Sequence, residues 1–157
     1  MMDIKILNKG NRNLLICTRN NGTIEKAEIG PNIPFHDLAH FIVEKHLGLK
    51  HGFYGNIYNG YTVKELSDKE IIKTLPVESV VSEIATRALQ SIWSGACSIE
   101  QFNSLIEAEF KNLSINFRLN LTEEEVFQMY SQYDELITQW KQLKEGESIE
   151  VRLTIKP

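Results

Sequence analysis

Residues 148–155, SIEVRLTI, form the most regular strand pattern in the chain. Apolar side chains alternate strictly with polar ones, which is typical of a β-strand with one buried face. The segment before it has helical spacing, so no second strand lies next to it in the sequence. A single strand leaves its backbone N–H and C=O groups unpaired. We therefore expect it to join a sheet that a distant part of the chain forms.

The first thirty residues supply that sheet. They alternate apolar and polar side chains in short runs broken by Asn and Gly, and predict strands at about 2–8, 13–19 and 23–29, joined as a meander. The pair Asn21-Gly22 favours a two-residue type I′ turn, because both residues tolerate positive φ. The apolar pairs that share a face are Ile4 with Ile6 and Leu14 with Ile16.

The middle of the chain is helical by its spacing and its capping residues. The prolines of GPNIP, residues 30–34, end the third strand, and the next helix runs from about His36 to its stop at Gly48. Residues 52–61, GFYGNIYNGY, predict a short irregular helix or a buried loop. Further helices are expected over 76–95, 99–113 and 123–144. Capping boxes pair Thr62 with Glu65, Ser98 with Gln101, and Thr122 with Glu125.

These elements predict one α+β domain over residues 1–157. We expect a small, mostly antiparallel sheet, made of the N-terminal meander plus the C-terminal strand, packed on one face against a helical bundle. The length fits one domain at about 150 residues each, and no linker, repeat or low-complexity segment divides the chain. The sequence leaves open whether the last strand runs parallel or antiparallel to its neighbour.

Composition excludes several classes of protein. The chain is 42% hydrophobic and 24% charged, as in a packed soluble domain. No apolar run approaches the roughly 20 residues of a membrane helix, and the N-terminus lacks a signal peptide, so we expect a cytoplasmic protein with no membrane partner. The net charge of -4 argues against nucleic acid as a partner. Cys17 and Cys97 lack paired spacing, and we expect free thiols in a reducing compartment.

All four histidines fall within sixteen residues, at positions 36, 40, 46 and 51. At about 100° per residue, His36, His40, Glu44 and Asp37 share an arc of about 100° on a helix that is otherwise mostly apolar. A narrow polar strip of two histidines and two carboxylates therefore follows one side of this helix.

One interpretation of the strip is a metal site. Histidines at i and i+4 can both bind one divalent transition-metal ion such as zinc. Glu44 is a poor third ligand, because its Cα lies about 12 Å along the axis from that of His36, but it can accept a ring N–H and orient His40. Asp37, His51 or a distant carboxylate would supply the third ligand. The function would be a metal-dependent enzyme, in the first place a hydrolase, with Asp37 or a bound water as base.

The alternative interpretation is structural. Asp37 is a natural helix cap whose carboxylate would accept the amide of Ala39 or His40. His36 would then lie outside the helix, the i, i+4 geometry would be lost, and the strip would be a solvated edge. His46 is expected as a hydrogen-bonded histidine of the core or its boundary, and His51 as a loop residue.

Two further site types receive little support. Gly52, Gly55 and Gly60 lack the spacing and the Lys-Ser/Thr ending of a nucleotide-binding loop. No serine sits in a strand-turn-helix elbow, and neither cysteine has a histidine nearby in sequence. The tyrosines of this segment either line an apolar pocket or fill the core; they are Tyr54, Tyr58 and Tyr61.

The stretch PFHDLAHFIVE, residues 34–44, followed by LGL at 47–49 and GFYG at 52–55, resembles a small family of bacterial proteins that carry a His-Asp-Leu-x-His block. The resemblance covers about residues 34–61. It implies a bacterial cytosolic origin, directs attention to His36, Asp37, His40 and Glu44, and brings no activity or cofactor. Two functions therefore remain: a binding or structural module that forms a homo-oligomer or binds a protein partner, or a metal-dependent hydrolase.

Overall fold

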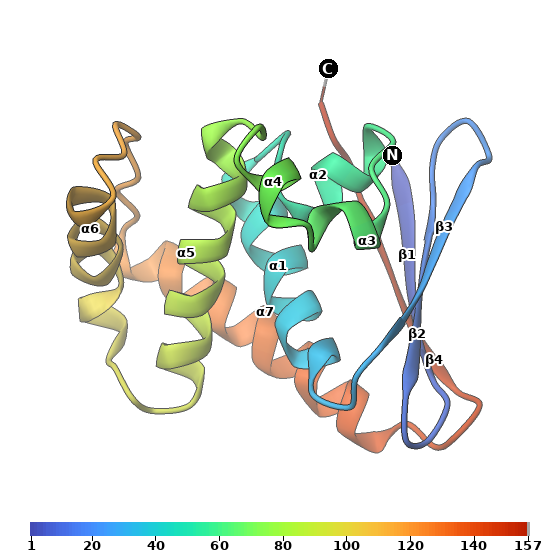
Figure 1. Cartoon of the computed structure of the whole chain (residues 1–157). Helices are drawn as coiled ribbons and strands as arrows, with labels where there is room; N and C mark the ends of the chain where they lie inside the picture. The colour runs from blue at the N-terminus through green and yellow to red at the C-terminus, as the bar shows by residue number, and fades with distance from the viewer. Residues whose placement is uncertain (157) are drawn as a thin grey trace.

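The chain ends meet in one antiparallel sheet, which helices cover on one side (Figure 1). A computed structural model describes residues 1–156. The strands are β1 (Met2–Asn8), β2 (Asn13–Thr18), β3 (Ile24–Ile29) and β4 (Ser148–Leu153), in the order β3-β2-β1-β4. The C-terminal strand β4 pairs antiparallel with β1, so that Ile149 lies opposite Ile6. The predicted α+β class and the joining of the two chain ends are confirmed.

The inner face of the sheet carries the apolar side chains that meet the helices. Ile4 lies opposite Cys17 and Ile6 opposite Leu15, and all four are almost fully buried. Leu14 and Ile16 do share a face, as predicted, but it is the outer face of the sheet, where both are only half-buried. This follows from the register, because successive side chains point to opposite faces of a strand.

The turn between β2 and β3 differs from the predicted two-residue turn. The amide of Gly22 donates to the carbonyl of Arg19 at 2.9 Å, and the amide of Arg19 donates to the carbonyl of Thr23 at 2.8 Å. The loop therefore has three residues, with Gly22 alone at positive φ (+86°). Glycine takes this conformation without steric cost, Asn21 keeps negative φ, and a three-residue loop with glycine last forms a common hairpin.

The helices expected over 76–95, 99–113 and 123–144 form, the first helix begins three residues before the expected His36, and the short helix at 69–72 is not predicted by the spacing. Their bounds are α1 (Ile33–Leu47), α2 (Phe53–Tyr58), α3 (Val63–Leu66), α4 (Lys69–Ile72), α5 (Val77–Trp93), the 3-10 turn η1 (Ile99–Gln101), α6 (Phe102–Asn112) and α7 (Glu123–Gln142). All three predicted capping boxes form. Residues 53–58 of the glycine-rich segment make one buried helical turn and a half, and the expected irregular helix is regular there.

Helix α1 occupies the centre of the molecule. It lies between the sheet and α5, while α7 crosses behind it and α6 forms the outer edge (Figure 1). The Tyr133 hydroxyl of α7 donates to the carbonyl of Phe35 at 2.7 Å and fixes the start of α1. Because α1 has neighbours on three sides, three of its polar side chains, Asp37, His40 and Glu44, are buried. No helix among the described residues is both long enough and apolar enough to span a bilayer.

Candidate metal centre

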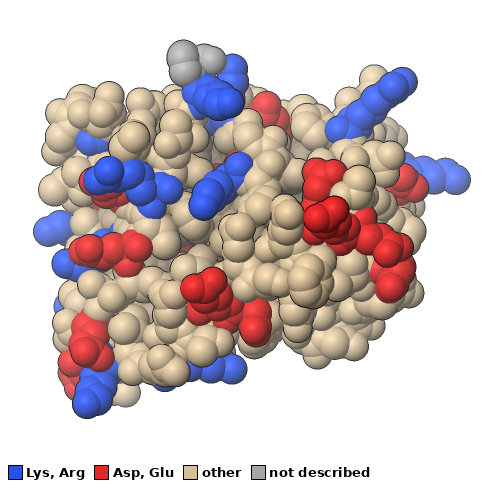
Figure 2. Space-filling view, turned by 180° about the vertical axis from the view of Figure 1, so that it is seen from behind, with Lys and Arg blue, Asp and Glu red and all other residues tan. Residues whose placement is uncertain are grey.

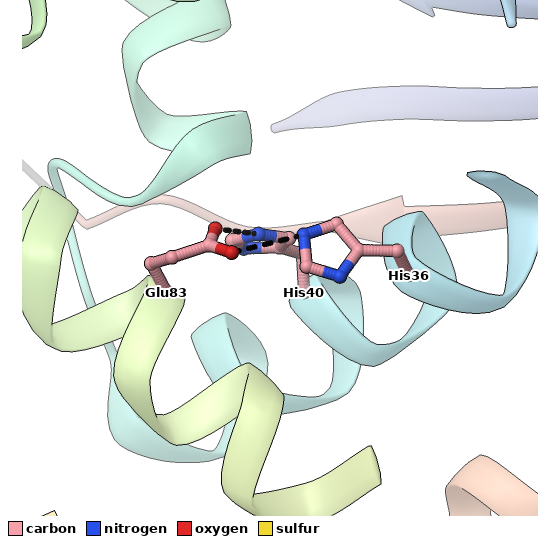
Figure 3. A group of neighbouring side chains, drawn as sticks. All are labelled: His36, His40 and Glu83. Atoms are coloured by element: carbon pink, nitrogen blue, oxygen red, sulfur yellow. Dashed lines mark hydrogen bonds and ion pairs between the residues drawn. The ribbon is translucent and has the colours of Figure 1, made fainter.

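Two histidines of α1 face one carboxylate of α5 (Figure 3). Nε2 of His36 lies 3.2 Å from Oε1 of Glu83, and Nε2 of His40 lies 2.9 Å from Oε2 of the same carboxylate. Over residues 1–156, this is the one group of three or more possible ligand side chains whose ligand atoms all lie within 4.8 Å of one another. The structure thus brings His36 and His40 together and adds a distant carboxylate, which is one of the three third ligands that the sequence left open.

The start of α1 explains why both histidines share a face. The helix begins at Ile33 after Asn32, and Pro34 lies in its first turn, where proline is favoured because its missing N–H is not needed. His36 and His40 are therefore both helical, with ring centroids 4.7 Å apart. The proposed cap at Asp37 is wrong, because a side chain beyond the first turn meets no free amide. The third strand does end at Ile29, before the two prolines, but the helix starts at Ile33 and not at about His36, because Pro34 belongs to its first turn.

The polar strip is also not a solvated edge. Asp37, His40 and Glu44 are 4%, 3% and 1% exposed. Helices α2 and α5 pack over this side of α1 and bury it. By contrast, the side chains of His36 and Glu83 are 32% and 42% exposed, so the group opens to solvent on their side.

The second ring nitrogen of each histidine is also held. Nδ1 of His36 lies 2.9 Å from Oε1 of Gln90, and Nδ1 of His40 lies 3.0 Å from Oε2 of Glu44. The predicted hydrogen bond between Glu44 and His40 is therefore present. In metal sites, a partner on Nδ1 fixes the ring so that Nε2 points to the ion. Here both Nε2 atoms already point to the same place.

Glu44 has a second role at the N-terminus of α2. Its carboxylate accepts from the amides of Phe53 at 2.8 Å and Tyr54 at 2.9 Å, and from the Ser82 hydroxyl at 2.7 Å. A Cβ on Gly52 would overlap this carboxylate. The glycine thus lets backbone amides approach an anion, as in a phosphate loop, but the anion is the chain's own Glu44.

In the absence of an ion, hydrogen bonds between the histidines and the carboxylates shift the pKa values of these side chains. Burial disfavours the charged form of His40, yet hydrogen bonds to Glu44 and Glu83 outweigh it and raise the pKa of His40 to about 9. The hydrogen bond to Glu83 also raises the pKa of His36. Burial raises the pKa of Glu83, but the two imidazoles hold it well below its usual range. Glu83 and the two imidazoles therefore stabilise one another's charged forms.

Asp37 does not join the group. Its carboxyl is buried, its Oδ2 atom has no hydrogen-bond partner, and burial raises its pKa to about 6. Asp37 supplies neither the third ligand nor an obvious base next to an ion bound by Glu83. It lies towards Cys17 and Tyr54, whose titrations it influences.

The other candidate residues have structural contacts. His51 uses its backbone to accept from the Ser79 hydroxyl at 2.6 Å, and it is not part of the group. His46 Nε2 lies 2.9 Å from Oε1 of Gln132, which agrees with the expected boundary histidine. Tyr54 is fully buried and belongs to the core. Cys17 and Cys97 are free, as predicted.

A pocket of about 330 Å³ adjoins the group. His40 and Glu83 belong to its wall, and apolar side chains of α2, α3 and α5 form much of the rest. The ring of Phe53 lies 5.4 Å from the ring of His40, centroid to centroid, and covers it. None of the three tyrosines proposed as pocket residues lines this pocket. A ligand in the pocket would reach the polar group directly.

Comparisons with protein-family models, with curated proteins and with solved structures find no match. The resemblance on the His-Asp-Leu-x-His block therefore stays a prediction. On the face turned away from the view of Figure 1, acidic and basic side chains are scattered among neutral ones, without a continuous basic surface (Figure 2). The expectation that nucleic acid is not a partner likewise stays a prediction.

Proposed function

We propose that the protein binds a divalent transition-metal ion, such as zinc, through His36, His40 and Glu83, and uses it as a metal-dependent hydrolase. One observation carries the proposal: two Nε2 atoms and one carboxylate converge, while both Nδ1 atoms are held by other side chains. Ring nitrogens oriented in this way are typical of metal ligands.

The donor set supports this choice of ion. Imidazole nitrogens together with one carboxylate suit zinc, iron or nickel rather than magnesium or calcium, which prefer oxygen ligands. The Glu83 carboxylate, which faces both rings, would give the ion a negatively charged ligand. Glu44 would then stay as a fixed acceptor behind His40.

A hydrolytic role follows from the number of ligands and from the pocket. Three protein ligands leave a coordination position open, as in catalytic rather than structural zinc sites. An ion held in this way supplies an activated water at neutral pH. The adjoining pocket gives a substrate access to that position. The chain's own contribution is to orient the ligands through Glu44 and Gln90.

A second candidate function is that of a binding or structural module, which needs no metal ion. It is favoured by the contacts of His40, whose two ring nitrogens already have partners in Glu44, Ser82 and Glu83. In that case the network would only tie α1 to α5, and the protein would act by self-association or by binding a protein partner.

Metal binding by the ion-free protein separates the two functions. After chelation and dialysis, we expect wild type to take up about one equivalent of zinc, measured by calorimetry and elemental analysis. His40→Ala and Glu83→Gln should lose this uptake. His46→Ala is the matched control, since His46 lies outside the group, and it should bind like wild type. Uptake below about a tenth of an equivalent, unchanged in His40→Ala, would refute the metal centre.

A further inference from the structure

We propose that the pocket beside the metal centre binds the body of a small aliphatic acyl compound, a carboxylate, ester or amide, whose polar head reaches His40 and Glu83. This inference rests on the proposed metal centre and adds the substrate class. It is argued from the chemistry of the pocket wall, from its mouth, and from the position of its polar end.

The wall of the pocket is mainly aliphatic. Side chains from four different segments contribute to it, namely Leu66 of α3, Ile72 of α4, Leu75 before α5, and Val80 and Ile84 of α5. Phe53 of α2 adds the one phenyl ring of the lining. A volume of about 330 Å³ lies at the small end of the range for ligand pockets. Such a wall favours an apolar body of modest size.

The polar side chains deep in the wall are already paired with each other. The Asn56 side-chain amide donates to the Ser79 hydroxyl at 2.8 Å, and that hydroxyl donates to the carbonyl of His51 at 2.6 Å. Their donor protons are all used within the wall, so they offer none to an acceptor on the ligand body. A body that carries hydroxyl or charged groups would lose its water without gaining a partner, which is costly.

The mouth of the pocket is apolar as well. Ile72 and Leu113 are 40% and 57% exposed, although both are large hydrophobic side chains. Arg87, the basic residue of the lining, is paired with Glu109 at 2.6 Å. The rim is apolar, and its one cation is already paired. It therefore suits a ligand whose aliphatic tail extends towards solvent better than a ligand with a charge at each end.

The polar end of the pocket supplies the remaining specificity. His40 and Glu83 are members of both the pocket wall and the three-residue group. A ligand whose aliphatic body fills the pocket therefore places its head at the open coordination position of the ion. A carboxylate or a carbonyl oxygen binds there, and a carbonyl bound to the ion is polarised for attack by water. The matching reaction is hydrolysis of an ester or amide of an aliphatic acid, in which water adds to the carbonyl, the C–O or C–N bond breaks, and the leaving alcohol or amine takes a proton.

Straight-chain alkyl hydroxamates from acetohydroxamate to octanohydroxamate test the inference, because their heads bind metals and their tails differ only in length. Zinc uptake is measured first, and then the affinity of each compound by calorimetry. We expect affinity to rise up to about fourfold for each methylene that enters the pocket, from a transfer free energy of about 0.8 kcal/mol per methylene.

A pair of valine variants on α5 provides the matched control. Val80 lines the pocket, whereas Val77, three residues earlier, is 45% exposed and lies outside the lining. Val80→Phe should abolish the gain with chain length and keep the zinc stoichiometry. Val77→Phe should behave like wild type in both respects.

The outcomes separate this inference from the proposed function. Zinc uptake with affinity independent of chain length, or an unchanged series in Val80→Phe, overturns the pocket assignment and leaves the metal centre intact. Binding that depends on chain length without zinc uptake overturns the metal centre and supports the pocket assignment. A peptide hydroxamate that binds zinc-loaded protein more tightly than octanohydroxamate overturns the aliphatic substrate class.

Discussion

The carboxylate of Glu44 lies one helical turn from His40, with 3.0 Å between its Oε2 atom and the Nδ1 atom of the ring, and both side chains are almost completely buried. The same carboxylate holds the first amides of α2, from which Phe53 projects over the His40 ring. Glu44 therefore orients His40, a candidate metal ligand, and also positions Phe53 in the wall of the adjoining pocket. Changes at Glu44 should affect metal binding and local structure together.

Glu44→Gln should weaken zinc binding by about 10- to 100-fold, the usual effect of removing a hydrogen-bonding carboxylate behind a histidine ligand. The glutamine keeps the size of the side chain but loses its charge and one acceptor oxygen. Calorimetric titration with zinc measures the change. Glu78→Gln is the matched control, because Glu78 also accepts backbone amides, from residues 50 and 51, but does not contact His40. Equal affinities in the two variants would contradict the orienting role.

Gly52→Ala should lower the free energy of unfolding by about 1–3 kcal/mol, as expected for overpacking at a buried position. Its Cβ would overlap the Glu44 carboxylate, and that contact has little room to relax because four donors hold the carboxylate. Urea denaturation measures the loss. Gly30→Ala is the control, since its Cβ would meet only Ile33 at 3.7 Å. If both variants are equally stable, the close approach is unimportant.

Asp37→Asn should change the pH dependence of stability in metal-free protein. The folded pKa of about 6 lies above the ordinary value of 3.8, because burial disfavours the carboxylate. The folded state thus binds the proton more tightly, and this contribution is complete below about pH 4 and is lost as the pH rises through about 6. The variant has no carboxyl group at this position and so does not lose stability over this range. Its free energy of unfolding, compared with that of wild type at the same pH, should therefore rise by about 3 kcal/mol between about pH 4 and pH 7. Urea denaturation across this range is the measurement, and parallel profiles would refute the assignment.

Zinc should stabilise wild type against unfolding, because an ion that binds only the folded state adds about 2.7 kcal/mol when its free concentration is 100 times the Kd. Glu83→Gln should show no such gain, and excess chelator should return wild type to its ion-free stability. Thermal unfolding with and without zinc gives the comparison. A similar shift of Tm in both proteins would mean that zinc binds elsewhere, for instance at His46 or His51.

The sequence predicts most of the local structure correctly because local structure depends on neighbours a few residues apart. The capping boxes at Thr62, Ser98 and Thr122 form because each joins residues only three positions apart. The alternation in β4 likewise predicts a strand with a buried face. The sequence predicts the start of α1 three residues too late, because Pro34 is compatible both with a strand end and with the first turn of a helix.

Part of the candidate site is likewise predictable from local spacing, and part is not. The shared face of His36, His40 and Glu44 follows from helical periodicity, and so does the hydrogen bond from His40 to Glu44. Glu83 lies 43 residues beyond His40. The sequence gives no reason to choose it as a metal ligand before other acidic residues. No periodic pattern relates the two positions.

By itself, the sequence determined the four strands, the longer helices, the three capping boxes and the polar strip on α1, since each depends on spacing within one element. Only the tertiary structure decided that β4 runs antiparallel to β1, that the strip is buried, and that Glu83 meets both histidines. The physical reason is that these features depend on how α1, α5 and the sheet pack against one another. That packing is set by the combined burial of many apolar side chains and is not encoded at any single position.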